Sequence, residues 1–296
     1  MTSGTGANPA ESSAAPIWVA IFGIFVLTVM DGVLKKLAQS HPVPDIALAR
    51  YLVATLVCLP FATRMRWPGR AGLKIHAARG LAVLATVLLF ITALKHLPLS
   101  EALTLTFLSP SLVALFGRVL LGEPVSRLTG VSIAVSFIGV LVVAGEDIAN
   151  WRTPTEDMIG VAAALGSAFA YALSLVLLRA RARVDGFFET VLIQNIILTI
   201  YLAPIAAWTT GGAPLIGFLT DWPSAIAMGA LGAAGHLLLG WAYRRAPAAR
   251  VGAVEYTGLI WGILLGLIWF GEWPGLNVLA GAALIVGGSG LLLARR

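Results

Sequence analysis

Long apolar runs alternate with short polar stretches along almost the whole chain. A helix needs about 20 residues to cross the hydrocarbon core of a bilayer, and backbone polar groups inside the core must be satisfied within the segment. Ten runs of about that length are separated by charged residues, proline or glycine. They cover residues 17–38, 44–63, 75–95, 99–121, 125–145, 158–181, 187–208, 222–243, 249–270 and 275–293. The pattern predicts an all-α integral membrane protein with ten transmembrane helices and short connections.

The second half of the chain repeats a short sequence motif of the first half. The stretches LLGEP and WFGEWP stand 149 residues apart, and this offset aligns Pro98 with Pro247, Gly122 with Gly271 and Glu123 with Glu272. Because each half then holds five helices, an odd number, the second half enters the membrane from the opposite side. We expect two inverted five-helix repeats around a central cavity, as in many secondary transporters. They comprise residues 17–147 and 148–296 and follow a tail, residues 1–16, that is polar, lacks Lys and Arg, and is expected to be disordered.

The basic residues predict the orientation of the helices. If the N-terminus is cytoplasmic, 15 of the 20 Lys and Arg residues fall on inner connections, as the positive-inside rule requires. These are Arg64, Arg66, Arg70, Lys74, Arg79, Arg118, Arg127, Arg179, Arg181, Arg183, Arg244, Arg245, Arg250, Arg295 and Arg296. We expect a multi-pass protein of the bacterial cytoplasmic (inner) membrane with both termini cytoplasmic.

Composition supports the membrane assignment and excludes other classes. Hydrophobic residues make up 58% of the chain, charged residues 11%, and the mean hydropathy is +0.90. The formal net charge is +6, but the basic residues form short clusters without interleaved aromatics, so no nucleic-acid partner is expected. Cys58 is the single cysteine, which excludes an internal disulfide and a metal site built from cysteines.

Three ionisable residues are predicted to lie deep within helices, where charge is costly and usually faces a cavity or a partner. Asp31 can pair with Lys35 one helical turn away, or bind a substrate or a proton. Glu255 can form a buried pair with His236 or Arg250, or line a cavity. It is expected on the same face as a glycine stripe that permits close helix packing, formed by Gly258, Gly262 and Gly266. His236 is either a packing element or a binding or proton-relay residue.

Further candidates lie on two other helices. Helix 99–121 has a polar face beside Pro110, which can kink the helix; the face comprises Ser100, Thr104, Phe107 and Ser111. It can join helices or line a central site. Tyr171 lies beside a stripe of small residues and is a candidate cavity wall. Glu123 and Glu272 are interpreted as helix caps at the membrane surface.

Catalytic signatures are missing from the sequence. It contains no HExxH, no GxSxG, no P-loop and no Cys/His metal spacing. We therefore expect a protein that is not an enzyme and needs no cofactor and no metal. A membrane-embedded lipid-modifying enzyme, the less favoured alternative, would need a nucleophile or metal cluster at one depth. Any transport would be facilitative or ion-coupled, with proton coupling through Asp31 or Glu255.

Each half ends in an apolar helix, a Gly-Glu dipeptide, a proline and a glycine-rich helix, in LLGEPVSRLTGVSIAVSFIGVLVV and WFGEWPGLNVLAGAALIVGGSGLLL. In this pattern the chain resembles the EamA family of the drug/metabolite transporter superfamily and, within it, the YddG-type exporters of aromatic and other amino acids. The resemblance covers nearly the whole chain after residue 17. It implies a basket of ten helices around a central cavity, with the fifth and tenth helices outside.

The resemblance also implies site residues. Phe107 and Ser109 of TFLSP match a cavity segment of the fourth helix, Glu255 and Tyr256 of AVEYT match one of the ninth, and His236 falls where the eighth helix should face the cavity. The chain departs from those exporters in being acidic at residues 31 and 255. The complete predicted substrate site comprises Asp31, Thr104, Phe107, Ser109, Tyr171, His236, Glu255 and Tyr256.

The expected function is export of small metabolites, above all amino acids, by alternating access. The expected partners are this small-molecule substrate and the lipid bilayer, with no obligate protein partner. The resemblance leaves open an uptake permease for a larger metabolite, such as a nucleotide-like compound, riboflavin or S-adenosylmethionine, because other relatives move these.

Overall fold

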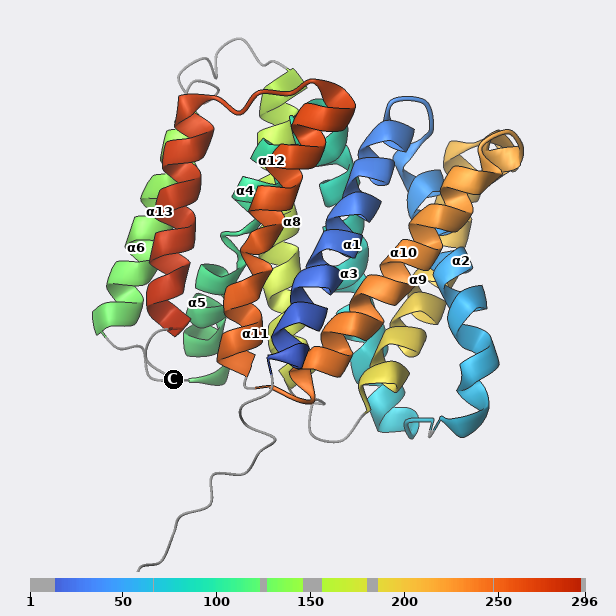
Figure 1. Ribbon diagram of the computed structural model, residues 1–296. Helices are drawn as coiled ribbons and strands as arrows, with labels where there is room; N and C mark the ends of the chain where they lie inside the picture. The colour runs from blue at the N-terminus through green and yellow to red at the C-terminus, as the bar shows by residue number, and fades with distance from the viewer. Residues whose placement is uncertain are drawn as a thin grey trace, which may run out of the picture.

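The computed structural model describes residues 14–65, 67–122, 127–145, 156–179, 186–246 and 248–293, and these residues contain helices and no strand (Figure 1). The α-helices are α1 (Ala15–Ala38), α2 (Val43–Cys58), α3 (Arg70–His96), α4 (Leu99–Thr106), α5 (Ser109–Leu121), α6 (Arg127–Val143), α8 (Glu156–Arg179), α9 (Phe187–Thr209), α10 (Trp222–Tyr243), α11 (Ala248–Glu255), α12 (Thr257–Phe270) and α13 (Leu276–Leu293), with short 3-10 helices at Leu59–Arg64 and Ile216–Leu219.

Seven helices in the described residues are long and apolar enough to cross a membrane, when α4 and α5 are taken together as one. Three shorter apolar helices coincide with the remaining predicted runs and cover Gly130–Val143, Thr257–Phe270 and Leu276–Gly288. The fold is therefore that of an integral membrane protein built from helices. The predicted tail, residues 1–16, falls almost entirely outside the described residues, and α1 begins at Ala15.

Two of the predicted helices are interrupted near their middle. The run 99–121 is divided into α4 and α5 at Phe107 and Leu108, two residues before Pro110, which cannot donate a backbone hydrogen bond. The run 249–270, predicted as one helix, is divided into α11 and α12 at Tyr256. No proline causes this second break. At this break the backbone forms a tight turn in which Leu259 N donates to Tyr256 O at 3.2 Å.

The residues Gly122 and Gly271 end α5 and α12 in nearly the same conformation. Their backbone angles are φ 67°, ψ 18° and φ 66°, ψ 21°, in the left-handed region that favours glycine. The Gly-Glu phrase is therefore a helix stop at both places. Glu123, which follows the first stop, lies outside the described residues.

The helices pack in pairs, with one helix of each pair from the first half of the chain and one from the second half. Within the bundle α3 lies along α8, α1 along α10, α2 along α9 and α6 along α13. Figure 1 shows the pair α6 and α13 at one edge of the bundle and α2 at the other, with α1, α8 and α12 between them. The α6 and α13 pair is so close that a Cβ added to Gly139 would lie 2.8 Å from Gly281 O. Small residues permit this approach of two backbones.

The glycine stripe of α12 packs against the first half of the bundle, as its spacing predicts. A Cβ on Gly258 would lie 3.2 Å from Ile24 of α1, and one on Gly262 would lie 2.4 Å from Leu103 of α4. All three glycines of the stripe, Gly258, Gly262 and Gly266, are buried. This contact holds α12 against α1 and α4 and brings the two interrupted helices together.

A buried ion pair joins α1 to the end of α12. Lys35 Nζ lies 2.8 Å from Glu272 Oε1, and the same ammonium group donates to Leu97 O. The second oxygen of Glu272 accepts a 2.8 Å hydrogen bond from Leu99 N at the start of α4. Glu272 thus caps α4, a different helix from those it adjoins in sequence. The expected local pair between Lys35 and Asp31 is not found, because Lys35 is turned toward Glu272.

Candidate functional site

The two helix breaks meet in space. Phe107, at the break between α4 and α5, contacts Tyr256, at the break between α11 and α12, with ring centroids 5.5 Å apart and planes inclined at 45°. The two residues are also related by the 149-residue offset of the sequence repeat. The Phe107 ring further reaches α12, where a Cβ on Gly258 would lie 3.5 Å from it.

The carboxylate of Glu255 is next to this aromatic contact. It accepts a hydrogen bond from the Tyr243 hydroxyl of α10 and has an electrostatic interaction with Tyr171 of α8. The side chain is half-buried. The expected partners His236 and Arg250 are therefore replaced by a tyrosine hydroxyl, which orients the carboxylate and leaves its charge uncompensated.

Asp31 and His236 lie near a common cation, Arg50 of α2. Electrostatic interactions join Arg50 to Asp31 and to His236. Within the described residues Asp31 forms neither an ion pair nor a hydrogen bond, although its side chain is half-buried. His236 Nδ1 donates to Gly232 O at 2.7 Å, because a carbonyl oxygen can only accept. This bond fixes the tautomer and leaves Nε2 as the free ring nitrogen.

Arg79 is a polar residue of the interior, although the charge pattern predicts it in a cytoplasmic connection between helices. The structure places it inside α3 with 6% of its surface exposed. Its Nη2 donates to the Gln194 side chain of α9, and its Nε is buried without a partner among the described residues. Electrostatic interactions reach Tyr51, Tyr171 and His236. The sequence carries a signal for this burial, because Arg79 lies within the predicted run 75–95.

Two partly exposed tyrosines interact with Glu255. Tyr171 is 43% exposed and Tyr243 is 37% exposed. Both nevertheless interact with Glu255, and Tyr171 interacts in addition with Arg79 on α3.

Two predicted site residues lie deeper in the packing. Thr104 is buried and its hydroxyl donates to Ser100 O at 2.7 Å. Ser109 is buried and its hydroxyl donates to Thr106 O at 2.6 Å, across the break between α4 and α5. Both hydroxyl protons are thus directed to carbonyl oxygens of α4. Among the described residues no group of three His, Cys, Asp or Glu side chains is arranged to hold a metal.

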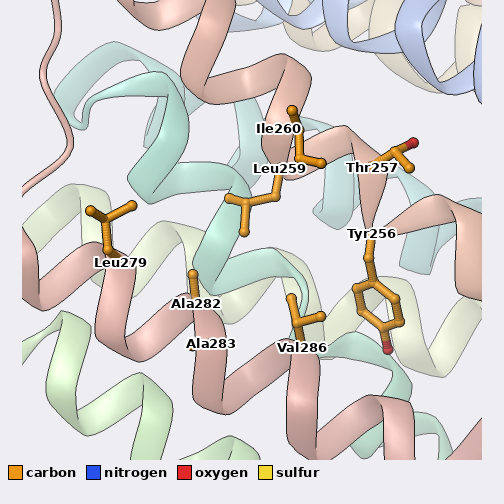
Figure 2. A pocket seen from close by; sticks show the side chains of 8 residues that line it. All are labelled: Tyr256, Thr257, Leu259, Ile260, Leu279, Ala282, Ala283 and Val286. Carbon is orange, nitrogen blue, oxygen red and sulfur yellow. The ribbon is translucent and has the colours of Figure 1, made fainter.

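An apolar groove of about 380 Å³ is lined in part by Tyr256 (Figure 2). Figure 2 shows side chains of the break and of α12 facing side chains of α13. The lining consists of Tyr256, Thr257, Leu259, Ile260, Leu279, Ala282, Ala283 and Val286. It contains no charged group. It therefore differs in character from the polar cluster, by which we mean Asp31, Arg50, Arg79, Tyr171, His236, Tyr243 and Glu255.

Comparisons with known proteins place this architecture in a family. The model of the EamA-like transporter family matches residues 14–145 and again residues 158–294. The chain is 24% identical over 274 residues to a pseudopaline exporter of Pseudomonas aeruginosa, covering 91% of this chain and 93% of the relative. It is 27% identical over 296 residues to a riboflavin transporter of Rhizobium johnstonii, covering 95% and 91%.

A solved crystal structure superimposes with a TM-score of 0.63 at 21% identity, covering 96% of this chain and all of the other, which shows a shared fold. The family model covers nearly the whole chain, and the helices are long and apolar enough to cross a bilayer. The protein is a multi-pass membrane transporter that belongs to the EamA-like family.

Proposed function

We propose that the protein exports small metabolites, above all amino acids, across the bacterial cytoplasmic membrane by alternating access around the polar cluster. The observation that carries this proposal is the meeting of half-exposed polar side chains from separate helices beside the two helix breaks. Interrupted helices free backbone groups and allow movement in the middle of a membrane protein, and transporters commonly bind substrate there.

The proposal includes ten spans arranged as two inverted repeats, with residues 17–147 and 148–296 as the units. The family model matches the chain twice, and both the helix breaks and the glycine stops recur at the same offset. The packing is consistent with this, because α3 packs against α8 and the helices equivalent to these two in the other repeat, α10 and α1, also pack together. His96 Nδ1 at the end of α3 lies 3.6 Å from Glu156 Oε2 at the start of α8. Leu97, the next residue, binds Lys35 near the end of α1, so α8 begins where α1 ends.

In this proposal Asp31 and Glu255 hold the ammonium group of the substrate or a coupling proton. Phe107, Tyr171 and Tyr256 form the aromatic wall, and His236 accepts a hydrogen bond at Nε2. Asp31 and Glu255 are each half-buried in the bundle, and neither has a cationic partner within 4 Å in the described residues. A carboxylate in that situation needs water, a proton or a ligand cation.

A second candidate is uptake of a larger metabolite through the same site. Similarity to riboflavin transporters favours it, at 27% identity to the Rhizobium johnstonii protein and 26% to one of Brucella anthropi. The two candidates differ in direction as well as in substrate. Cells that overproduce the protein should lose the preloaded solute in the first case and accumulate the external solute in the second.

The test is flux in proteoliposomes made from purified protein. Labelled amino acids and riboflavin are offered singly, with empty liposomes as the baseline. Glu255→Gln and Asp31→Asn should each lower amino acid flux at least about 10-fold, since a hydrogen bond to a charged group contributes about 1.5–3 kcal/mol. Glu156→Gln, a change in an exposed acid at a helix end, is the matched control. Flux of amino acids that is unchanged in both site variants would contradict the assigned roles.

A further inference from the structure

Two guanidinium groups of the interior, those of Arg50 and Arg79, stand out by their surroundings. Neither Arg50 nor Arg79 forms an ion pair within the described residues. Arg79 is buried, uses one nitrogen for Gln194, and keeps Nε without an acceptor. A guanidinium carries five donor hydrogens in a fork that suits a carboxylate. A buried donor that no protein group satisfies can be satisfied by an acceptor on a ligand.

Both cations lie close to one imidazole. His236 interacts electrostatically with Arg50 and with Arg79, which reach it from α2 and α3. Arg50 is held over the Tyr51 ring, 5.1 Å from its centroid, and its Nε is 3.7 Å from the position that a Cβ on Gly232 would occupy. A larger side chain at Gly232 would crowd this guanidinium. The side chains thus keep two positive charges around one region of the interior.

Two acids interact electrostatically with members of this group. Asp31 interacts with Arg50, and Glu255 interacts with Tyr171, which in turn interacts with Arg79. The cluster therefore contains two guanidinium groups and two carboxyl groups, with the imidazole donating its Nδ1 proton to a backbone carbonyl. A ligand with one charge of each sign preserves this balance. A ligand with a net charge adds an uncompensated charge inside the membrane, which is disfavoured.

We infer that the central site recognises zwitterions, with the substrate carboxylate at Arg50 and Arg79 and the substrate ammonium at Asp31 or Glu255. This inference rests on the transport function proposed above, because it names the substrate class of the same site. It adds the anion-binding half of the site, which involves residues that the sequence analysis did not select. It also separates this chain from transport of an uncharged solute such as riboflavin.

The experiment compares three forms of one solute in proteoliposomes: an amino acid such as leucine, the amine that lacks its carboxylate, and the N-acetyl acid that lacks its ammonium group. The wild-type protein should transport the amino acid at least about 10-fold better than either analogue, and riboflavin should not compete. Arg79→Gln should weaken leucine transport about 10- to 100-fold and leave the small flux of the amine unchanged. Arg118→Gln, at an exposed arginine near the end of α5, is the matched control.

The outcomes separate the two levels of the proposal. Equal transport of leucine and its amine by the wild-type protein, or equal losses of both in Arg79→Gln, would overturn the zwitterion inference and leave export intact. No flux of any solute above empty liposomes would contradict the proposed function itself. Arg50→Gln, at a half-buried position, provides the same comparison if Arg79→Gln does not fold. The comparison of analogues in the wild-type protein needs no variant.

Discussion

The ion pair between Lys35 and Glu272 allows a prediction in which the structure sets the magnitude. The Lys35 side chain is 8% exposed and the Glu272 side chain 20%, so the pair is shielded from water. Glu272→Gln retains the shape and can still accept from Leu99 N, but it leaves the ammonium of Lys35 without a carboxylate, with the Leu97 carbonyl oxygen and the Phe270 ring, 5.4 Å away, as its partners. Removing one member of a buried pair costs about 3–5 kcal/mol.

Because Glu272 is partly exposed and Gln preserves one hydrogen bond, we expect a loss at the lower end, about 3 kcal/mol. At about 2 °C per kcal/mol for a large domain, the melting temperature should fall by about 6 °C. The assay is thermal unfolding of the purified protein in detergent. Glu156→Gln is the control, since its acid is 87% exposed and pairs only with His96. Such a surface pair contributes at most about 1 kcal/mol.

A double-mutant cycle tests whether the loss comes from the pair itself. Lys35→Met removes the ammonium, so adding Glu272→Gln to Lys35→Met should cost much less than Glu272→Gln alone. The reasoning is refuted if the melting temperature of Glu272→Gln is within 1 °C of the wild-type value, taking about 1 °C as the smallest resolvable shift. It is also refuted if the two substitutions destabilise additively.

Three further predictions follow from the packing, with Gly69→Ala as a shared control because a Cβ there meets nothing within 4 Å. Gly271→Ala should destabilise the protein by about 1 kcal/mol, since its φ of 66° strains any side chain, and the thermal melt should show it. Gly262→Ala places a Cβ 2.4 Å from Leu103, so the yield of monodisperse protein on size exclusion should fall well below that of the control. Phe107→Ala removes a ring from the contact between the two helix breaks and should cost about 3 kcal/mol or more in the same melt; an unchanged melt would exclude an energetic role for this contact.

The sequence predicted most helix limits because they depend on the length of apolar runs. The ends at Ala38, Leu121 and Tyr243 and the start at Phe187 agree with the structure, since charge, proline or glycine punctuates the chain there. The break at Tyr256 was missed because no proline marks it. It depends on backbone hydrogen bonds within the turn, which hydropathy does not report.

The polar site was only partly predictable. Asp31 and Glu255 are single charges within apolar runs, and this pattern predicts a functional site. Arg79 lies near the start of an apolar run, where a basic residue is expected to set the orientation of the helix. The partners of these residues could not be predicted from the sequence, because they depend on the rotation of each helix within the bundle. Tyr243 is the partner of Glu255, and no spacing rule connects a residue at the end of α10 with one at the end of α11.

The position of Asp31 relative to Lys35 links the site to the ion pair with Glu272. Residues four apart lie on one face of a helix, one turn from each other. Asp31 therefore borders the polar cluster while Lys35, one turn further along the same rigid segment, holds the end of α12. A ligand that pulls Asp31 toward the cluster must move this segment, and release of Lys35 from Glu272 frees it to move. In the alternating access proposed above, one end of the bundle would open while the centre is occupied, and the cost of breaking this ion pair would then contribute to the barrier for opening that end. A variant that lacks the pair should open this end more readily, at the same time as it loses stability.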